Sequence, residues 1–390
     1  MEKCRLGDVC TFLSGGTPKI DVKEFWNGTI PFVSAISMHD TYILDSKSHI
    51  SEEGLKHGSR LLTKNNLLLL VRGSMLWNTI PICLNKNDVA FNQDVKGIIA
   101  NDTINNEFLL YWLKSKEQRL KYMVTGTGLG AGKLDTSDLL SMIVYIPAMK
   151  EQDKVARLLS LFDERIATQS KIIDKLQSLI KGLEDNLLDN PLWEKTYLRS
   201  FMQFFSTNSL SWEQLSYEEG EIRNLHYGLI HGFQTRGINS ASLPMIKNEA
   251  IPKQYTLCQV GDVAFADASE DTSEIAKSVE FADTIEGYTI CGLHTIHGRD
   301  IKNRTVVGFK GFAFNSRYFH NQIKRLAQGT KVFSITANNL SSCYVYLPDF
   351  DTQKAIVKLL KAYEEKLLVS KRLLEQYEKQ KQYLLRQMFI

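Results

Sequence analysis

Two segments of the chain carry the same long alternation of apolar and polar positions. Apolar residues recur at steps of four and three from Val155 to Leu187, and again from Ile356 to Met388. This spacing is typical of the apolar seam of a coiled coil, and each segment predicts a helix about 50 Å long. The first seam comprises Val155, Leu159, Phe162, Ile166, Gln169, Ile173, Leu176, Ile180, Leu183 and Leu187. The second comprises Ile356, Leu360, Tyr363, Leu367, Ser370, Leu374, Tyr377, Lys381, Leu384 and Met388.

The two segments belong to an internal repeat. When the sequence is shifted by 201 residues, Tyr145-Ile146-Pro147 superimposes on Tyr346-Leu347-Pro348 and Gln152 on Gln353. The one polar position in the first seam, Gln169, falls on Ser370 in the second. Identical phase makes two unrelated helices in one core a poorer interpretation than a pair of antiparallel helices related by a pseudo-two-fold repeat.

The repeat predicts four regions. Two globular parts span 1–146 and 191–347, and two helical segments span 147–190 and 348–390. Strand and helix patterns mix in both globular parts, so the predicted class is α+β. The predicted strands are Asn66–Val71, Ile98–Ile99, Ser141–Ile146, Asp262–Ala266, Thr289–Ile290 and Ser342–Leu347. The predicted helices are Glu107–Met123 and Phe314–Ala327, each followed by a glycine-threonine turn.

Composition excludes several classes of protein. The 390 residues are 43% hydrophobic and 23% charged, as in ordinary globular proteins. The longest strongly apolar block, Leu67–Val71, is too short to cross a bilayer, and the amino terminus lacks the apolar stretch of a secretory signal. We therefore expect a cytoplasmic protein without membrane association. Six scattered cysteines with no Cys-x-x-Cys pair favour reduced thiols over disulfides or a zinc site.

No catalytic constellation emerges from the motifs. The glycine-rich loop 126–133 departs from a phosphate-binding loop because Thr127 replaces its first glycine and Leu134 follows Lys133. His294 and His297 have no glutamate between them in the zinc-protease manner, so they are expected in the core or on the surface. The prediction is a chain without catalytic residues, bound metal or cofactor.

Other features suit nucleic acid. A net charge of +3 neither demands nor excludes DNA. Between Arg299 and Lys331, however, eight basic residues alternate with aromatic ones, which predicts an aromatic core face with cations directed at phosphates. The DNA-contact candidates are Arg72, Ser74, Thr127 and Lys133 in the first part, and Arg236, Arg304, Thr330 and Lys331 in the second. A capping role for Arg72 at a strand end, and a plain flexible loop at 126–133, remain open alternatives.

The order of these landmarks resembles the specificity subunit of type I restriction-modification enzymes. The resemblance covers the whole chain and rests on two divergent globular regions, each followed by a heptad helix introduced by (Ile/Leu)-Pro-x-x-x-x-Gln. The openings Leu6-Gly7-Asp8-Val9 and Gly15-Gly16-Thr17-Pro18 are similar to the start of a target-recognition domain of that family.

The resemblance implies that each globular region reads one half of a split double-stranded DNA target, with the paired helices holding the two regions apart. It also implies partners: two methyltransferase subunits that use S-adenosylmethionine, which ATP- and Mg-dependent restriction subunits can join. The chain itself would supply recognition without chemistry. The alternatives are a coiled-coil adaptor that joins proteins without reading DNA, and a nucleotide-dependent enzyme using the loop 126–133.

Overall fold

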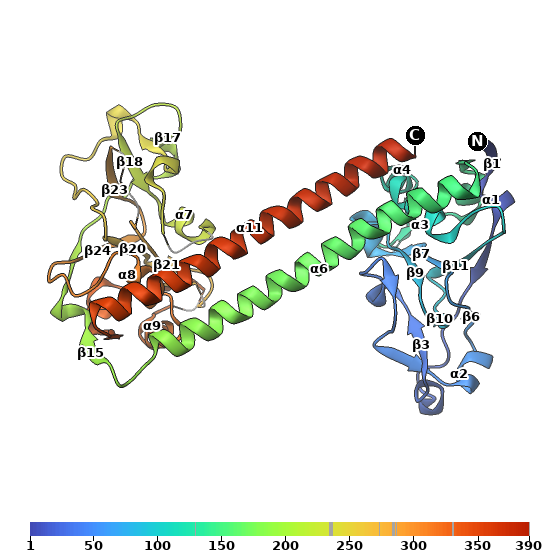
Figure 1. Ribbon diagram of the computed structural model, residues 1–390, viewed down its shortest axis with the longest axis horizontal. Coiled ribbons are helices and arrows are strands. Elements are labelled where there is room, and N and C mark those ends of the chain that lie inside the picture. Colours follow the sequence, from blue (N-terminus) through green and yellow to red (C-terminus); the bar gives the residue numbers. More distant parts are fainter. Residues whose placement is uncertain are drawn as a thin grey trace. The chain divides into compact units, whose positions relative to one another are not determined.

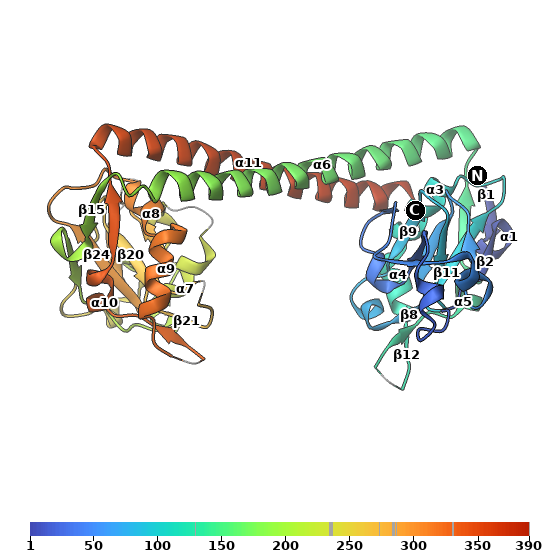
Figure 2. The same cartoon turned by 90° about the horizontal axis from the view of Figure 1, so that it is seen from below.

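The computed structural model describes residues 1–128, 130–233, 237–272, 274–282, 285, 287–329 and 331–389. The chain divides into two compact units, which Figures 1 and 2 show from two sides. Unit 1 comprises Met1–Ser170 together with Leu373–Ile390, and unit 2 comprises Lys171–Arg372. Two long helices therefore contribute to both units.

These helices are α6 (Met149–Leu188, 40 residues) and α11 (Phe350–Met388, 39 residues). Both helices start before the predicted seams begin. At about 1.5 Å per residue each is about 60 Å long, which is longer than the predicted 50 Å. Unit 1 contains the start of α6 and the end of α11, and unit 2 contains the reverse, so the helices run antiparallel. The α+β class with an antiparallel helix pair is confirmed. None of the described helices combines the length and apolarity needed to span a bilayer.

The predicted seam is buried or half-buried along both helices except at its last position. Met388 is 37% exposed, so its assignment to the seam is wrong. Leu385 and Phe389 are buried instead and join the core of unit 1, where the Phe389 ring centre lies 5.2 Å from that of Phe108. The last turn of α11 packs on this core, so its apolar face is one residue out of phase with the seam.

Unit 1 is built on a mixed five-stranded sheet with strand order β2-β11-β7-β9-β4. All four residues of its β7 strand have no exposed surface, which explains the unbroken leucine run in the sequence. The strands described in unit 1 are β1 (Glu2–Arg5), β2 (Cys10–Ser14), β3 (Ile30–Val33), β4 (Tyr42–Ile43), β5 (Ser48–Ile50), β6 (Leu61–Leu62), β7 (Leu67–Leu70), β8 (Arg72–Gly73), β9 (Ile82–Asn85), β10 (Val89–Phe91), β11 (Val95–Ala100), β12 (Thr125–Gly126), β13 (Gly132–Lys133) and β14 (Ile143–Ile146). Its short helices are α1 (Leu6–Val9), η1 (Lys23–Trp26), η2 (Ala35–Ser37), α2 (Glu52–Lys56), η3 (Ser74–Trp77), α3 (Asn106–Ser115), α4 (Glu117–Tyr122) and α5 (Thr136–Ser141).

Unit 2 repeats this plan with a sheet of order β16-β24-β20-β22, in which β16-β24-β20 corresponds to β2-β11-β7. The strands described in unit 2 are β15 (Glu194–Tyr197), β16 (Met202–Phe205), β17 (Leu215–Ser216), β18 (Ile222–Leu225), β19 (Met245–Ile246), β20 (Val263–Ala266), β21 (Ala268–Ser269), β22 (Ser278–Glu280), β23 (Tyr288–Cys291), β24 (Thr295–Asp300), β25 (Phe333–Ser334) and β26 (Tyr344–Leu347). Its helices are η4 (Leu198–Ser200), η5 (Trp212–Gln214), α7 (Tyr227–Gly232), η6 (Ser240–Ser242), η7 (Asn248–Ala250), α8 (Phe309–Ala313), α9 (Arg317–Leu326) and α10 (Ala337–Ser342).

All six predicted strands overlap observed ones. The predicted helix Glu107–Met123 divides at Lys116 into α3 and α4, and the predicted helix Phe314–Ala327 is shortened to α9. The last predicted strand of each part begins two residues late because a helix, α5 or α10, ends at its first predicted residue, Ser141 or Ser342.

The repeated glutamine connects the start of each long helix to its own unit through hydrogen bonds. Gln152 Nε2 donates to the carbonyls of Thr103 and Pro147, and its Oε1 accepts from the Asn105 amide at 2.7 Å. Gln353 repeats all three bonds in unit 2, at 2.9 to 3.0 Å. Both side chains are 1% exposed. The spacing Pro-x-x-x-x-Gln thus places a buried side-chain amide where it bonds three backbone groups.

Candidate nucleic-acid interface

A ribbon of three short strands in unit 1 brings together two predicted DNA-contacting residues. β8 pairs antiparallel with β13, which places Arg72 directly opposite Lys133, and β12 pairs with the other edge of β13. In Figure 2 this ribbon lies at the end of unit 1 away from α6. Arg72 and the neighbouring Ser74 are exposed, and Lys133 is half-buried. Two basic side chains far apart in sequence therefore stand side by side.

The ribbon ends in a tight turn. The amide and hydroxyl of Thr127 both donate to the Ala131 carbonyl, at 2.8 and 2.9 Å, and the Gly130 amide donates to the Thr127 carbonyl. Gly130 has φ +78°, a conformation that favours glycine, and a Cβ added at Gly128 or Gly130 would meet open space. The glycine-rich segment is thus the tip of a β-hairpin and not a phosphate-binding loop, which needs a strand followed by a helix.

An exposed tryptophan, which the sequence analysis did not single out, supports this tip. Trp77 is 49% exposed, and its indole N–H donates to the Gly130 carbonyl at 3.0 Å. Trp77 lies in η3, immediately after β8, so it accompanies Arg72 and Ser74 on one short segment. A flat aromatic surface beside basic groups is a common feature of nucleic-acid contacts, because bases and sugars pack against it. No local motif in the sequence distinguishes Trp77, because it directly follows the apolar residues Met75 and Leu76.

The two cations of the ribbon differ in their electrostatic surroundings. Lys133 Nζ lies 2.7 Å from the Asp135 carboxylate, so part of its charge is compensated. Within the described part of the chain, no carboxylate forms an ion pair with Arg72. Arginine offers two parallel N–H donors, which suits a guanine edge or a phosphate. Arg72 is therefore the more available of the two for an anionic or hydrogen-bonding ligand.

Unit 2 contains a corresponding ribbon with different side chains. β21 pairs antiparallel with β25, and an isolated bridge joins Gln328 to Ser334. Lys331 is exposed on the turn between these two residues. In Figure 2, β21 lies at the end of unit 2 away from the start of α11. The predicted contacts Arg236 and Thr330 lie outside the described residues.

The structure does not place Arg304 on this ribbon. Its guanidinium lies 2.6 Å from the carboxylate of Glu194, on the first residue of β15, and its carbonyl accepts from Gln353 at the start of α11. Arg304 therefore lies at the helix end of unit 2 and not on the ribbon, and its role as a DNA contact stays a prediction. The partner is 110 residues away in the sequence, which is why charge spacing did not reveal it.

The basic segment 299–331 divides into two groups. Four of its five aromatic residues, Phe309, Phe312, Phe314 and Phe319, are buried as predicted, and the fifth, Tyr318, is half-buried. Two of its cations are held inside: Lys310 is 2% exposed and lies 3.0 Å from buried Glu280, and Arg299 binds Asp262. Burial opposes ionisation of Asp262, but hydrogen bonds from Arg299 and His297 outweigh it and lower the pKa of this carboxyl.

The remaining basic residues of the segment lie at the surface. Lys302, Arg317, Lys324, Arg325 and Lys331 are all exposed. The expectation that the cations as a group face DNA is therefore wrong for Arg299 and Lys310, because the buried carboxylates of Asp262 and Glu280 bind them. The two ribbons remain the places where predicted contacts and exposed surface coincide.

Comparisons of the sequence and of the fold with known proteins both find specificity subunits of type I restriction enzymes. Residues 1–178 match the sequence model of the type I restriction modification DNA specificity domain. The specificity subunit of the type I restriction enzyme MjaVIII from Methanocaldococcus jannaschii is 24% identical over 97% of this chain and 90% of its own length. The specificity subunit of EcoR124I/EcoR124II from Escherichia coli is 31% identical over 160 residues, which is 40% of each chain.

A solved structure has the same fold over the full length. The crystal structure of the type I restriction-modification system S subunit from M. genitalium covers 100% of this chain and 96% of its own, with a TM-score of 0.61 at 16% sequence identity. A chain from a structure titled as the basis of complex assembly and conformational transition of the type I R-M system covers 98% of this chain with a TM-score of 0.56.

Proposed function

We propose that this chain, a member of the family of type I restriction-modification specificity subunits, reads DNA through the exposed ribbon of each unit. In unit 1 the reading group is Arg72 with Ser74, Trp77, Thr127 and Lys133. In unit 2 it is the ribbon that carries Lys331. Arg236 and Thr330 stay predicted contacts from the sequence alone. Recognition of a DNA target is the role that the family match supports, and the ribbons are our assignment of where it happens.

The difference between equivalent ribbon positions carries the proposal of a two-part target. Arg72 stands opposite Lys133 in unit 1, and at the same register positions Ala268 stands opposite Ser334 in unit 2. Arginine favours guanine through O6 and N7, whereas an alanine methyl group packs on the thymine methyl. Two readers with such different side chains favour different half-sites, so the target is asymmetric.

We also propose that the two long helices set the length of the unspecified spacer between the half-sites. Half-sites on one face of B-DNA recur about every 34–36 Å, and a 40-residue helix is about 60 Å long, so one to two turns of DNA lie within its reach. Removal of two heptads from both helices is then expected to shorten the preferred spacer while leaving both half-sites unchanged.

In this proposal the catalytic steps are carried out by other subunits of the assembly. The relatives are named as specificity subunits of restriction enzymes, which supports a non-catalytic role for this chain in a larger assembly. The proposed partners are double-stranded DNA and two methyltransferase subunits carrying S-adenosylmethionine, an assembly that restriction subunits requiring ATP and Mg²⁺ can join. The competing function, a coiled-coil adaptor that ignores DNA sequence, is not favoured because the DNA specificity domain family matches residues 1–178.

Selection of preferred duplexes from a random pool by the complex of this chain with its methyltransferase tests the proposal. Arg72→Ala is expected to relax one half-site and leave the other unchanged, with a loss of about 1–3 kcal/mol for the preferred base. Lys3→Ala is the control, because Lys3 is an exposed cation on β1, beside the start of α6 in Figure 2. A complex without sequence preference, or one that selects a palindrome, would refute the proposal.

A further inference from the structure

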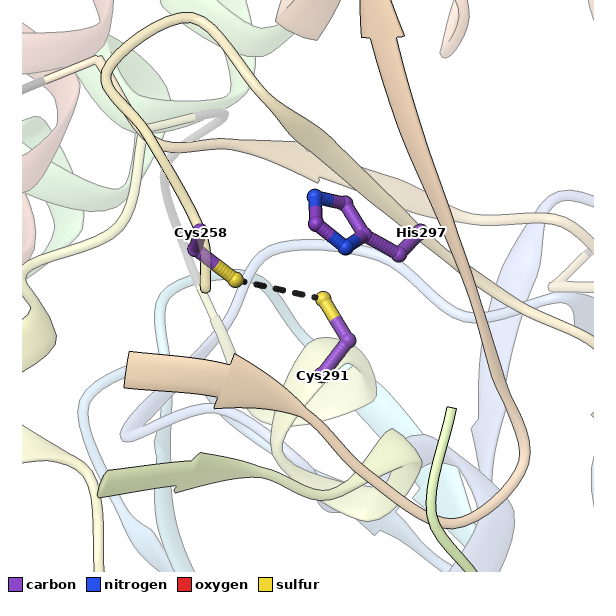
Figure 3. Close-up of side chains that lie close together, drawn as sticks. All are labelled: Cys258, Cys291 and His297. Atoms are coloured by element: carbon purple, nitrogen blue, oxygen red, sulfur yellow. Dashed lines mark hydrogen bonds between the residues drawn. The ribbon is translucent and has the colours of Figure 1, made fainter. Parts of the chain in front are cut away.

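A cluster of two cysteines and a histidine lies buried in unit 2. Figure 3 shows the side chains of Cys258, Cys291 and His297 converging on one point. They are 7%, 3% and 1% exposed, and one potential ligand atom from each lies within 4.8 Å of the others. All six cysteines of the chain are free thiols, as their spacing predicts. The sequence did not reveal this cluster because its members come from three separate segments.

The geometry of the cluster matches that of a tetrahedral cation. The two sulfur atoms are 3.6 Å apart. Two thiolates at about 2.3 Å from a zinc ion, with a tetrahedral angle between them, lie about 3.8 Å apart. A sulfur pair with one imidazole nitrogen is a ligand set that zinc and its close analogues prefer over magnesium or calcium.

The orientation of the histidine is fixed by an outer partner. His297 Nε2 lies 2.7 Å from the carboxylate of Asp262, which is 1% exposed and also binds the Arg299 guanidinium at 2.7 Å. An ionised carboxylate only accepts hydrogen bonds, so Nε2 carries the proton and donates it. In a neutral imidazole the Nδ1 lone pair is then free to bind a cation, an arrangement found at most histidine metal ligands.

In unit 1 the positions equivalent to the three cluster residues carry no metal-binding side chains. Strand register makes His297 equivalent to Gly97, because each faces the matching residue on both neighbouring strands. Cys258 and Cys291 correspond to Leu62 and Phe91 by the pairing of the neighbouring strands. A Cβ on Gly97 would lie 3.0 Å from the Phe91 ring and 3.1 Å from Leu62, so these apolar side chains fill the space over the glycine.

With a divalent cation bound, the charges of the cluster and of its neighbours in unit 2 would balance. Two thiolates neutralise a divalent cation, and the guanidinium of Arg299 neutralises the carboxylate of Asp262. A buried site without net charge avoids the large cost of an uncompensated ion. A cavity of about 300 Å³, lined in part by Thr207, Asn208, Cys291 and His297, borders the cluster and leaves room for a water molecule as fourth ligand.

We propose that unit 2 binds one zinc-class divalent cation through the sulfurs of Cys258 and Cys291 and through His297 Nδ1, with water as the fourth ligand. Binding displaces the two thiol protons to solvent. The cation joins the segment before β20, the end of β23 and the middle of β24. Because β23 and β24 belong to different sheets, the ion cross-links the two sheets of this unit.

The test uses the full-length purified chain. Metal analysis is expected to find about one zinc per chain, and exchange into Co²⁺ should produce the absorption of tetrahedral cobalt with sulfur-to-metal charge transfer. Cys258→Ser, Cys291→Ser and His297→Gln should each lose the metal and this spectrum. Cys343→Ser is the matched control, because Cys343 is a buried thiol of the same unit at 1% exposure and lies outside the cluster.

A second variant separates ligation from folding. Cys258→Leu combined with Cys291→Phe and His297→Gly installs the residues of unit 1, and it should fold without metal and no longer respond to chelators. Chelation should lower the unfolding temperature of the natural protein but not of this variant. A natural chain that contains no zinc and takes up no Co²⁺ would overturn the proposal, whether its thiols are free or form a disulfide. Equal metal loss in Cys343→Ser would overturn it too.

Discussion

Replacing Gln353 by alanine tests whether the repeated glutamine holds each long helix to its unit. The substitution removes three hydrogen bonds at 1% exposure: one accepted from the Val306 amide and two donated to the carbonyls of Arg304 and Pro348. A buried backbone group without a partner costs about 1–3 kcal/mol. Three fully buried groups would cost about 3–9 kcal/mol. Because two of the three bonds are only part-buried, water restores part of this, and we expect a loss of about 3–5 kcal/mol.

Hydrogen exchange resolved by region is the suitable assay, because two compact units need not unfold in one step. Protection of the Val306 amide and of the first turns of α11 should fall by about a hundredfold or more, and unit 1 should be unaffected. Gln380→Ala, on an exposed position of the same helix, is the control and should change nothing. Gln152→Ala should give the mirror result, with unit 1 destabilised and unit 2 intact.

Gln353→Glu separates hydrogen bonding from packing. Glutamate has nearly the same shape, but an oxygen then faces the two carbonyls that Nε2 donates to. If the hydrogen bonds matter, this variant is as unstable as the alanine variant at neutral pH. A stable Gln353→Glu protein, or an alanine variant within about 0.5 kcal/mol of the natural one, would refute the reasoning.

Three other side chains of unit 1 give further tests. Lys381→Ala leaves the Asp163 carboxylate, 12% exposed, without its ammonium partner and should cost about 3 kcal/mol in urea unfolding, and an unchanged midpoint would contradict this. Trp77→Ala should weaken target binding by the methyltransferase complex about tenfold in fluorescence anisotropy without changing stability, whereas unaltered affinity would exclude Trp77 from the interface. Burial, and then repulsion by Lys381, lower the pKa of Lys114 to about 8. The unfolded chain therefore binds more protons above pH 8, so stability should rise by roughly 1–3 kcal/mol from pH 8 to 10, and a Lys114→Met protein that keeps this rise would disprove the assignment.

Local patterns account for what the sequence could predict. The heptad spacing and the repeat depend on residues close together in the chain, so both long helices and the α+β class followed from them. The seam failed at Met388, where the packing partner changes from a helix to the core of unit 1. Periodicity describes which face of a helix is apolar but not which surface that face meets.

Distant pairings account for what the sequence could not predict. Arg72 and Lys133 were selected separately, and only the register of β8 with β13 reveals that they are neighbours. Arg304 was selected for its charge, which Glu194 binds. Each basic residue in a sequence is a candidate for contact with DNA. Ion pairs within the fold determine which of these residues remain available to bind DNA.

The internal repeat separates structural residues from recognition residues without an alignment of relatives. Gln152 and Gln353 bond equivalent backbone groups of their own units, and both copies keep this residue. At register positions that face outward the copies differ, as Arg72 and Ala268 do. A difference at a position on the reading ribbon changes which base is favoured and leaves the frame intact. The positions that distinguish the two ribbons are therefore where exchange between units should transfer half-site preference.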